Sequence, residues 1–178
     1  MNGNRGHGSY LLVLVNGDGS IEHPSGRLTD PTAAKETIVA TPVELSGGCL
    51  CGAIRYRIVG TPVFVGQCYC KDCRKATGTG HATVLGVPEN QLFVEGKPAV
   101  YASQGGSGGE VRRHFCPVCA GRLYTSADSS GPIRMVQAGS LDEPNAVTPT
   151  VAIFVKDALS WDRIDPALTK FEHLPPRP

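Results

Sequence analysis

The sequence predicts a mainly β domain with little helix, and three features of the chain support this prediction. Its 22 glycines and 14 prolines divide the 178 residues into short segments. Only 6% of the residues are aromatic. One segment alternates apolar and polar side chains with a period of two, as a half-buried strand does. Short strands separated by frequent turns are typical of an all-β domain.

The chain divides into three parts of different character. Residues 1–42 are rich in Asn, Gly, Asp, Ser, Thr and Pro, and they are predicted to form an N-terminal extension and linker. Within it only Tyr10–Val15 is strand-like. Residues 43–174 are predicted to form the folded domain, and 175–178 a short tail. One core suffices at this length, so a second full domain is not expected.

Alternation is clearest at Ala53–Ile58, where two isoleucines and a tyrosine share one face and two arginines the other. One or two helical turns are predicted at Lys71–Ala76, with Asp72 as the expected cap. Gly105–Gly109 is expected to join two strands. Further strands, broken by Gly, Pro and Asn, are predicted at Pro62–Val65, His81–Val87, Gln91–Val94, Ala99–Tyr101, Val111–Phe115, Arg122–Tyr124, Ile133–Ala138 and Val151–Val155.

The charge balance argues against a polyanionic partner. With 17 basic and 16 acidic residues, the chain has no excess charge to hold nucleic acid or a membrane surface, so a small-molecule partner is expected. The apolar run Leu11–Val15 is too short for a signal peptide or a membrane span. We therefore expect a cytoplasmic protein, in which closely spaced thiols act as metal ligands or catalytic groups rather than in disulfides. Assembly into a homo-oligomer stays open.

All seven cysteines lie in three short clusters. The clusters are Cys49 and Cys51, then Cys68, Cys70 and Cys73, then Cys116 and Cys119. A Cys-x-x-Cys turn can direct two thiolates at one metal ion, and glycines beside the first pair would let the backbone approach it closely. Three disulfides would leave one thiol unpaired, whereas one metal site with four cysteine ligands and another with three would use all seven cysteines. Metal binding is therefore predicted.

Spacing alone allows two divisions of these ligands. In the first, the Cys-x-x-Cys pairs at 70–73 and 116–119 form a zinc-ribbon site, which leaves three cysteines without a role. In the second, the pairs at 49–51 and 116–119 form a closed four-thiolate site, and the cluster at 68–73 forms a local three-thiolate site.

Four segments resemble the glutathione-dependent formaldehyde-activating enzyme family, namely Gly48–Gly52, Cys68–Lys75, Phe115–Cys119 and Gly139–Asp142. The resemblance runs from about residue 43 to about residue 171 and fills all seven cysteine positions. It implies a Mss4-like fold of folded antiparallel sheets around zinc, and it implies the second division of the ligands. Two zinc ions per chain would follow, a structural one at Cys49, Cys51, Cys116 and Cys119 and a catalytic one at Cys68, Cys70 and Cys73.

Some positions depart from the family's usual pattern. Ala120 and Gly121 replace a common Gly-Ser, Tyr69 stands where His is frequent, and Ala152 stands where many relatives have His. These positions border the expected pocket and bear on the substrate. Trp161 falls where members often carry a tryptophan, and it is predicted to be a core or lid aromatic.

The resemblance implies an enzyme of the carbon–sulfur lyase type. Zinc held by three thiolates keeps one coordination position free, which we expect to take the sulfur of glutathione and lower the pKa of its thiol. The thiolate would add to formaldehyde and give S-hydroxymethylglutathione. Two other functions stay open, a non-catalytic zinc module that binds a protein partner and a thiol-binding zinc protein with another substrate.

Several charged and titratable residues have two interpretations each. Lys71, Arg74 and Lys75 flank the ligands and either hold the carboxylates of glutathione or form a solvated helix face. His81 and His114 either transfer protons or are structural residues of strands.

Overall fold

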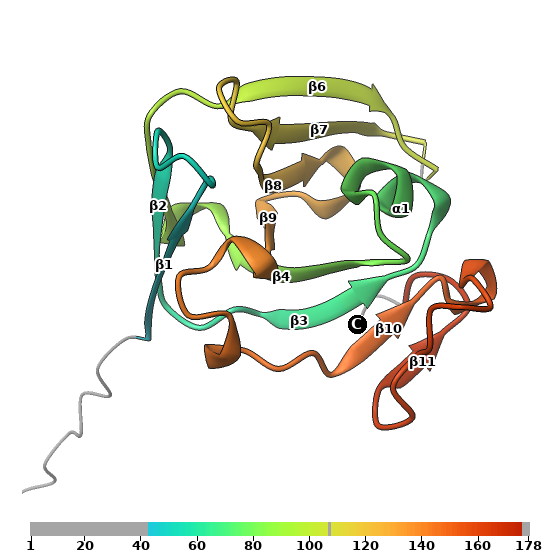
Figure 1. Ribbon diagram of the computed structural model, residues 1–178. Coiled ribbons are helices and arrows are strands. Elements are labelled where there is room, and N and C mark those ends of the chain that lie inside the picture. Colours follow the sequence, from blue (N-terminus) through green and yellow to red (C-terminus); the bar gives the residue numbers. More distant parts are fainter. Residues whose placement is uncertain (1–42, 107, 176–178) are drawn as a thin grey trace, which may run out of the picture. The chain divides into compact units, whose positions relative to one another are not determined.

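The computed structural model describes residues 43–106 and 108–175 (Figure 1). The predicted extension, with its strand-like segment Tyr10–Val15, lies outside these residues, as do 176–178. The described part is mainly β with little helix, which confirms the predicted class. Its strands are β1 (Glu44–Gly48), β2 (Arg55–Val59), β3 (Phe64–Cys68), β4 (Ala82–Pro88), β5 (Leu92–Glu95), β6 (Ala99–Gln104), β7 (Glu110–Phe115), β8 (Arg122–Ala127), β9 (Ile133–Gln137), β10 (Val151–Ile153) and β11 (Thr169–Phe171).

These strands form two sheets. The smaller sheet has the antiparallel order β1-β2-β5, and the larger has the order β11-β10-β3-β4-β9-β8-β7-β6. The larger sheet is mixed rather than purely antiparallel, because β10 runs parallel to both β3 and β11. Parallel neighbours need a long connection, and most of the domain lies between β3 and β10 in the sequence.

One main core joins the two sheets. Alternation on β2 buries Tyr56 and Ile58, as the sequence predicted, and these side chains pack with Leu85 of β4 and Val136 of β9. Burial of large apolar side chains at the junction holds the sheets together, at about 1.5 to 3 kcal/mol for each one. Trp161, in contrast, is 69% exposed, so the prediction of a core aromatic was wrong, and a lid role stays a prediction.

The α-helix, α1 (Lys71–Thr77), lies where the sequence predicted it and is followed by Gly78 in the left-handed conformation. Its cap is not Asp72, as expected, but Cys70, whose Sγ accepts a hydrogen bond from the Cys73 amide. The capping residue must directly precede the first helical residue, and Asp72 is already inside the first turn. No helix in the described ranges is long and apolar enough to cross a lipid bilayer.

Candidate metal centres

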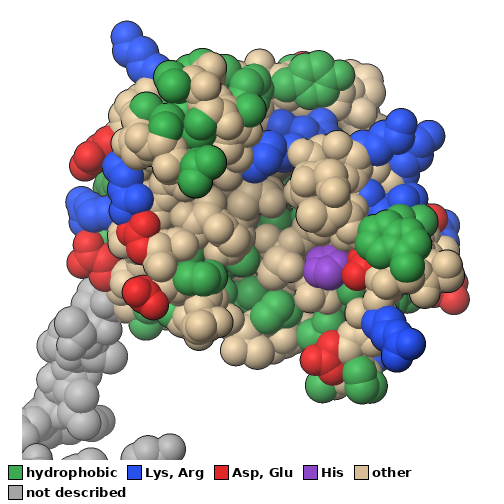
Figure 2. Space-filling model, viewed as in Figure 1, with side chains coloured by type: hydrophobic (Ala, Val, Ile, Leu, Met, Phe, Trp, Pro, Cys, Tyr) green, Lys and Arg blue, Asp and Glu red, His purple; other side chains and the backbone are tan. Residues whose placement is uncertain are grey.

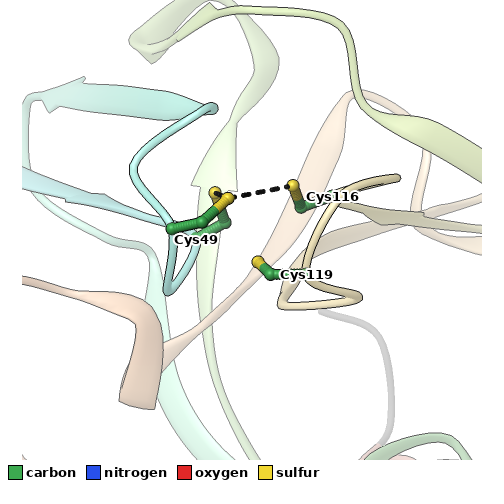
Figure 3. Close-up of side chains that lie close together, drawn as sticks. Cys49, Cys116 and Cys119 are labelled. Carbon is green, nitrogen blue, oxygen red and sulfur yellow. Dashed lines mark hydrogen bonds between the residues drawn. The ribbon is translucent and has the colours of Figure 1, made fainter.

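Four cysteines from two distant segments converge in a single group (Figure 3). Cys49 and Cys51 lie between β1 and β2, and Cys116 and Cys119 lie between β7 and β8. The Sγ atom of Cys51 is 3.6 Å from that of Cys49 and 3.7 Å from that of Cys116. Four sulfurs around a tetrahedral zinc ion are about 3.8 Å apart, because each Zn–S bond is about 2.3 Å. The donor set therefore fits zinc.

Glycines shape the loop that carries the first pair. Gly52 has a φ of +77°, and its amide donates to the carbonyl of Cys49. A Cβ on Gly47 would meet the Tyr56 hydroxyl at 2.3 Å, and one on Gly48 would meet the Ile54 carbonyl at 2.5 Å. These two glycines permit close packing against Tyr56 and Ile54, and the expected approach of the backbone to a metal stays a prediction. The Ile54 amide also donates to the Cys49 sulfur.

The second pair sits in a tight turn of its own. The Val118 amide donates to the Cys116 sulfur, and the Ala120 amide donates to the Cys116 carbonyl. Amides of Gly121 and Cys51 hold the pKa of Cys119 at about 6. Amide donors that favour the thiolate form also favour metal binding, because a ligating cysteine must be deprotonated.

Cys68, Cys70 and Cys73 form the second group, with their sulfurs within 4.8 Å of one another. Cys68 ends β3 and is buried, Cys70 caps α1, and Cys73 lies in its first turn. Hydrogen bonds from the Cys68 and Cys73 thiols lower the pKa of Cys70 to about 2, and the bond to Cys70 raises the pKa of Cys68. In the part of the chain that the structure describes, no further His, Cys, Asp or Glu joins this group.

The sulfurs thus group as four and three, the arrangement of the second ligand division. All seven cysteines are free thiols rather than disulfides in this structure. That these groups hold zinc, and how many ions each chain binds, stay predictions.

The structure gives a packing role to Gly139–Asp142, the fourth segment that resembles the family. Ser140 bonds the Tyr56 hydroxyl at 2.7 Å and Asp142 pairs with Arg55, so this segment fastens the small sheet to the end of β9.

A histidine–aspartate pair contacts Tyr69, the residue between Cys68 and Cys70. His81 Nδ1 is 2.8 Å from Asp162 Oδ2, and the His81 ring lies 4.9 Å from that of Tyr69, which separates two of the cysteines. His81 also lines an open cavity of about 690 Å³, together with Thr77 and Thr79. Nothing in the sequence pattern pointed to Asp162, which is brought to His81 by tertiary packing alone.

The other candidates have different surroundings. His114 stacks on Tyr124, with 4.1 Å between ring centroids, and burial lowers its pKa, as fits a structural histidine. Arg74 donates to the Tyr69 carbonyl, so it braces the loop between two ligands. Lys71 is exposed, whereas Lys75 lines a cleft that also contains Arg113 and Arg122, two residues that the sequence analysis missed.

Two of the departures from the family pattern are packing residues. Tyr69 and Ala152 are both fully buried and pack with Leu168 in a small second core. Neither lines the cleft beside α1 or the cavity beside His81, and the expectation that both border the substrate pocket stays a prediction. Ala120 and Gly121, in contrast, each line one of the two cavities.

Comparison with known proteins decides the family. The family model described as glutathione-dependent formaldehyde-activating enzyme matches residues 44–157. The chain belongs to this family. A curated Halomonas elongata protein, named "Putative glutathione-dependent formaldehyde-activating enzyme", is 39% identical over 85 residues. That match covers 45% of this chain and 54% of the relative, so the chain spans about half the length of this relative.

A solved structure shows a weaker likeness. The crystal structure of a Rhodobacter sphaeroides protein covers 58% of this chain and 91% of its own length, with a TM-score of 0.45 and 21% sequence identity.

Proposed function

We propose that this family member is a zinc-dependent enzyme that joins the thiol of glutathione to formaldehyde, a reaction of the carbon–sulfur lyase type. The observation that carries the proposal is the group of Cys68, Cys70 and Cys73, which offers three sulfurs and has no fourth side-chain ligand among the described residues. Three protein ligands and an open position are typical of catalytic zinc. Membership of the family supports glutathione and formaldehyde as the substrates.

The two cysteine groups have different tasks in this proposal. Zinc at the three-cysteine group would supply Lewis acidity, which lowers the pKa of a thiol that reaches its open position. The four-cysteine group would hold the second zinc and tie the β1–β2 loop to the β7–β8 turn. Its role is structural, since all four positions are taken by protein sulfurs.

The reaction adds the thiol across the carbonyl group. A carbon–sulfur bond forms, the carbonyl π electrons move to oxygen, and the thiol proton ends on that oxygen to give the hydroxymethyl group. We assign the proton transfer to His81. With Nδ1–H donated to the Asp162 carboxylate, Nε2 would take the proton from the thiol and return it to the oxygen.

The decisive experiment measures thiol binding and rate together. With cobalt in place of zinc, glutathione is expected to produce a new thiolate-to-metal absorption band in the wild-type protein. Exchange between free and S-hydroxymethylated glutathione, followed by NMR, is expected to exceed the uncatalysed rate, which is itself appreciable. Cys68→Ser should abolish both signals. An unchanged spectrum at saturating glutathione, or a rate equal to the background, would refute the proposal.

The same titration separates the alternative functions. A non-catalytic module that binds a protein partner requires a fourth ligand on the three-cysteine metal, and the described residues supply none. A band with glutathione but no acceleration with formaldehyde would instead favour a thiol-binding zinc protein with another substrate. The cytoplasmic location expected from the sequence stays a prediction.

A further inference from the structure

An open cleft of about 530 Å³ lies between α1 and the strands β6 to β8. Lys75, Arg113 and Arg122 line it, and Asp72 is the one acidic residue among its lining side chains. Figure 2 shows lysine and arginine side chains gathered on the viewed face of the molecule, on the side where α1 lies. The cleft therefore carries an excess of positive charge, although the chain as a whole is nearly neutral.

The positive charges in this cleft form no ion pair with the protein in the part of the chain that the structure describes. In 43–106 and 108–175, none of the ion pairs involves Lys75, Arg113 or Arg122. The other arginines on neighbouring strands are paired, as Arg112 is with Glu110 and Asp128. Unpaired cations in a concave site attract an anion from solution, because the field of several like charges adds up there.

The two arginines are held in place by hydrogen bonds. Arg113 Nη1 donates to Ser103 Oγ at 2.7 Å, and Arg122 Nη1 donates to the Ala76 carbonyl at 2.6 Å. The Nε of Arg122 is buried, and within the described residues it has no hydrogen-bond partner. A buried donor without an acceptor is costly, so this atom indicates that an acceptor from outside the protein completes the site.

This cleft adjoins the three-cysteine group. Asp72 and Lys75 line the cleft and flank Cys73 on α1, and Arg122 donates to the carbonyl of Ala76 on the same helix. The cysteines themselves do not line the cleft. A ligand with its sulfur at the three-cysteine group could therefore extend a different part of itself toward the two arginines.

We propose that this cleft is a carboxylate subsite for the thiol substrate, with Arg113 and Arg122 as the charged donors. The inference depends on the proposed function, and it narrows the substrate to thiols that carry a carboxylate at a distance from the sulfur. A guanidinium group presents parallel N–H donors that match the two oxygens of a carboxylate. Glutathione has two carboxylates and a central thiol, so it meets this requirement.

The test compares two thiols, one with free carboxylates and one with both carboxylates esterified. Cobalt-substituted protein is titrated with glutathione and with its dimethyl ester, in which both carboxylates are masked. Wild-type protein is expected to bind glutathione about tenfold or more tightly than the ester. Arg113→Gln is expected to lower the affinity for glutathione by about tenfold and to leave the affinity for the ester unchanged. Arg112→Gln is the matched control, because it removes the same charge from the adjacent position of β7 but lies outside the cleft.

The outcomes separate the subsite from the underlying function. The subsite would be overturned if wild-type protein bound the two thiols with equal affinity, or if Arg113→Gln lost the same affinity for both. Neither result would contradict the open coordination position at the metal. A missing absorption band with both thiols would overturn the proposed function and the subsite with it. If Arg113→Gln fails to load cobalt, Arg113→Lys replaces it, since it keeps the charge and removes only the paired N–H geometry.

Discussion

Ala120 stores strain that a single substitution should release. It follows the last cysteine of the four-cysteine group and has a φ of +58°, a conformation that costs a residue with a Cβ about 1 to 2 kcal/mol. Its side chain is exposed, so removing the methyl group loses little buried area. Glycine carries an entropy cost of about 0.5 to 1 kcal/mol relative to alanine. Ala120→Gly is therefore expected to raise the free energy of unfolding by about 0.5 to 1 kcal/mol.

Thermal unfolding of the zinc-loaded protein, followed by circular dichroism, measures this gain. For a chain of this size the expected rise in melting temperature is about 1 to 4 °C. Ala102→Gly is the matched control, because Ala102 is also exposed but lies in β6 without a positive φ. It is expected to lose about 0.5 to 1 kcal/mol through the same entropy cost. Equal destabilisation by both substitutions would show that the turn at Ala120 holds no strain.

Three further predictions concern the metals, the sheet junction and the proton transfer. Metal analysis should find two zinc ions per chain in the wild type and one in Cys68→Ser, which should keep its fold. Cys116→Ser should lose the fold together with its metal, and circular dichroism would show this loss. The hydrogen bonds from Arg55 hold the pKa of Asp142 below its usual value. The ionised carboxylate therefore stabilises the fold at neutral pH, and this contribution is lost as the pH falls through the lowered pKa. Asp142→Asn should therefore be less stable to urea than wild type at pH 7, and the gap should narrow below about pH 4; a constant gap would contradict the ion pair's role. His81→Gln should slow the NMR exchange rate about 10²-fold or more while the cobalt–thiolate band persists, and an unchanged rate would exclude His81 as the proton carrier.

Local patterns predicted most of the sheet. Each of the nine predicted strands overlaps an observed one, since period-two alternation and glycine or proline breaks are local signals. Strands β1 and β11 were not predicted. Strand β1 ends in two glycines, and its extended form depends on pairing with β2 and on a bridge to Leu141. Strand β11 has three residues that pair in parallel with β10, a partner that local sequence cannot identify.

The site could be predicted only where its residues are close in sequence. The cluster at 68–73 was evident from spacing, but spacing did not reveal which pair would join the cysteines at 116–119. The contact of Arg122 with α1, and of Asp162 with His81, arises from packing between elements that are far apart in the sequence. A charged residue in a strand gives no signal of the face on which a distant helix will dock.

The two cysteine groups differ in how much of the chain must be made before each can close. The sulfurs of Cys68, Cys70 and Cys73 come from one short stretch, so the entropy needed to gather them is small and independent of the later strands. The group of four joins 49–51 to 116–119 and cannot assemble until β7 has been synthesised. A nascent chain would therefore complete its three-cysteine group first, and the four-cysteine group would close only after the segment that follows β7 has been made.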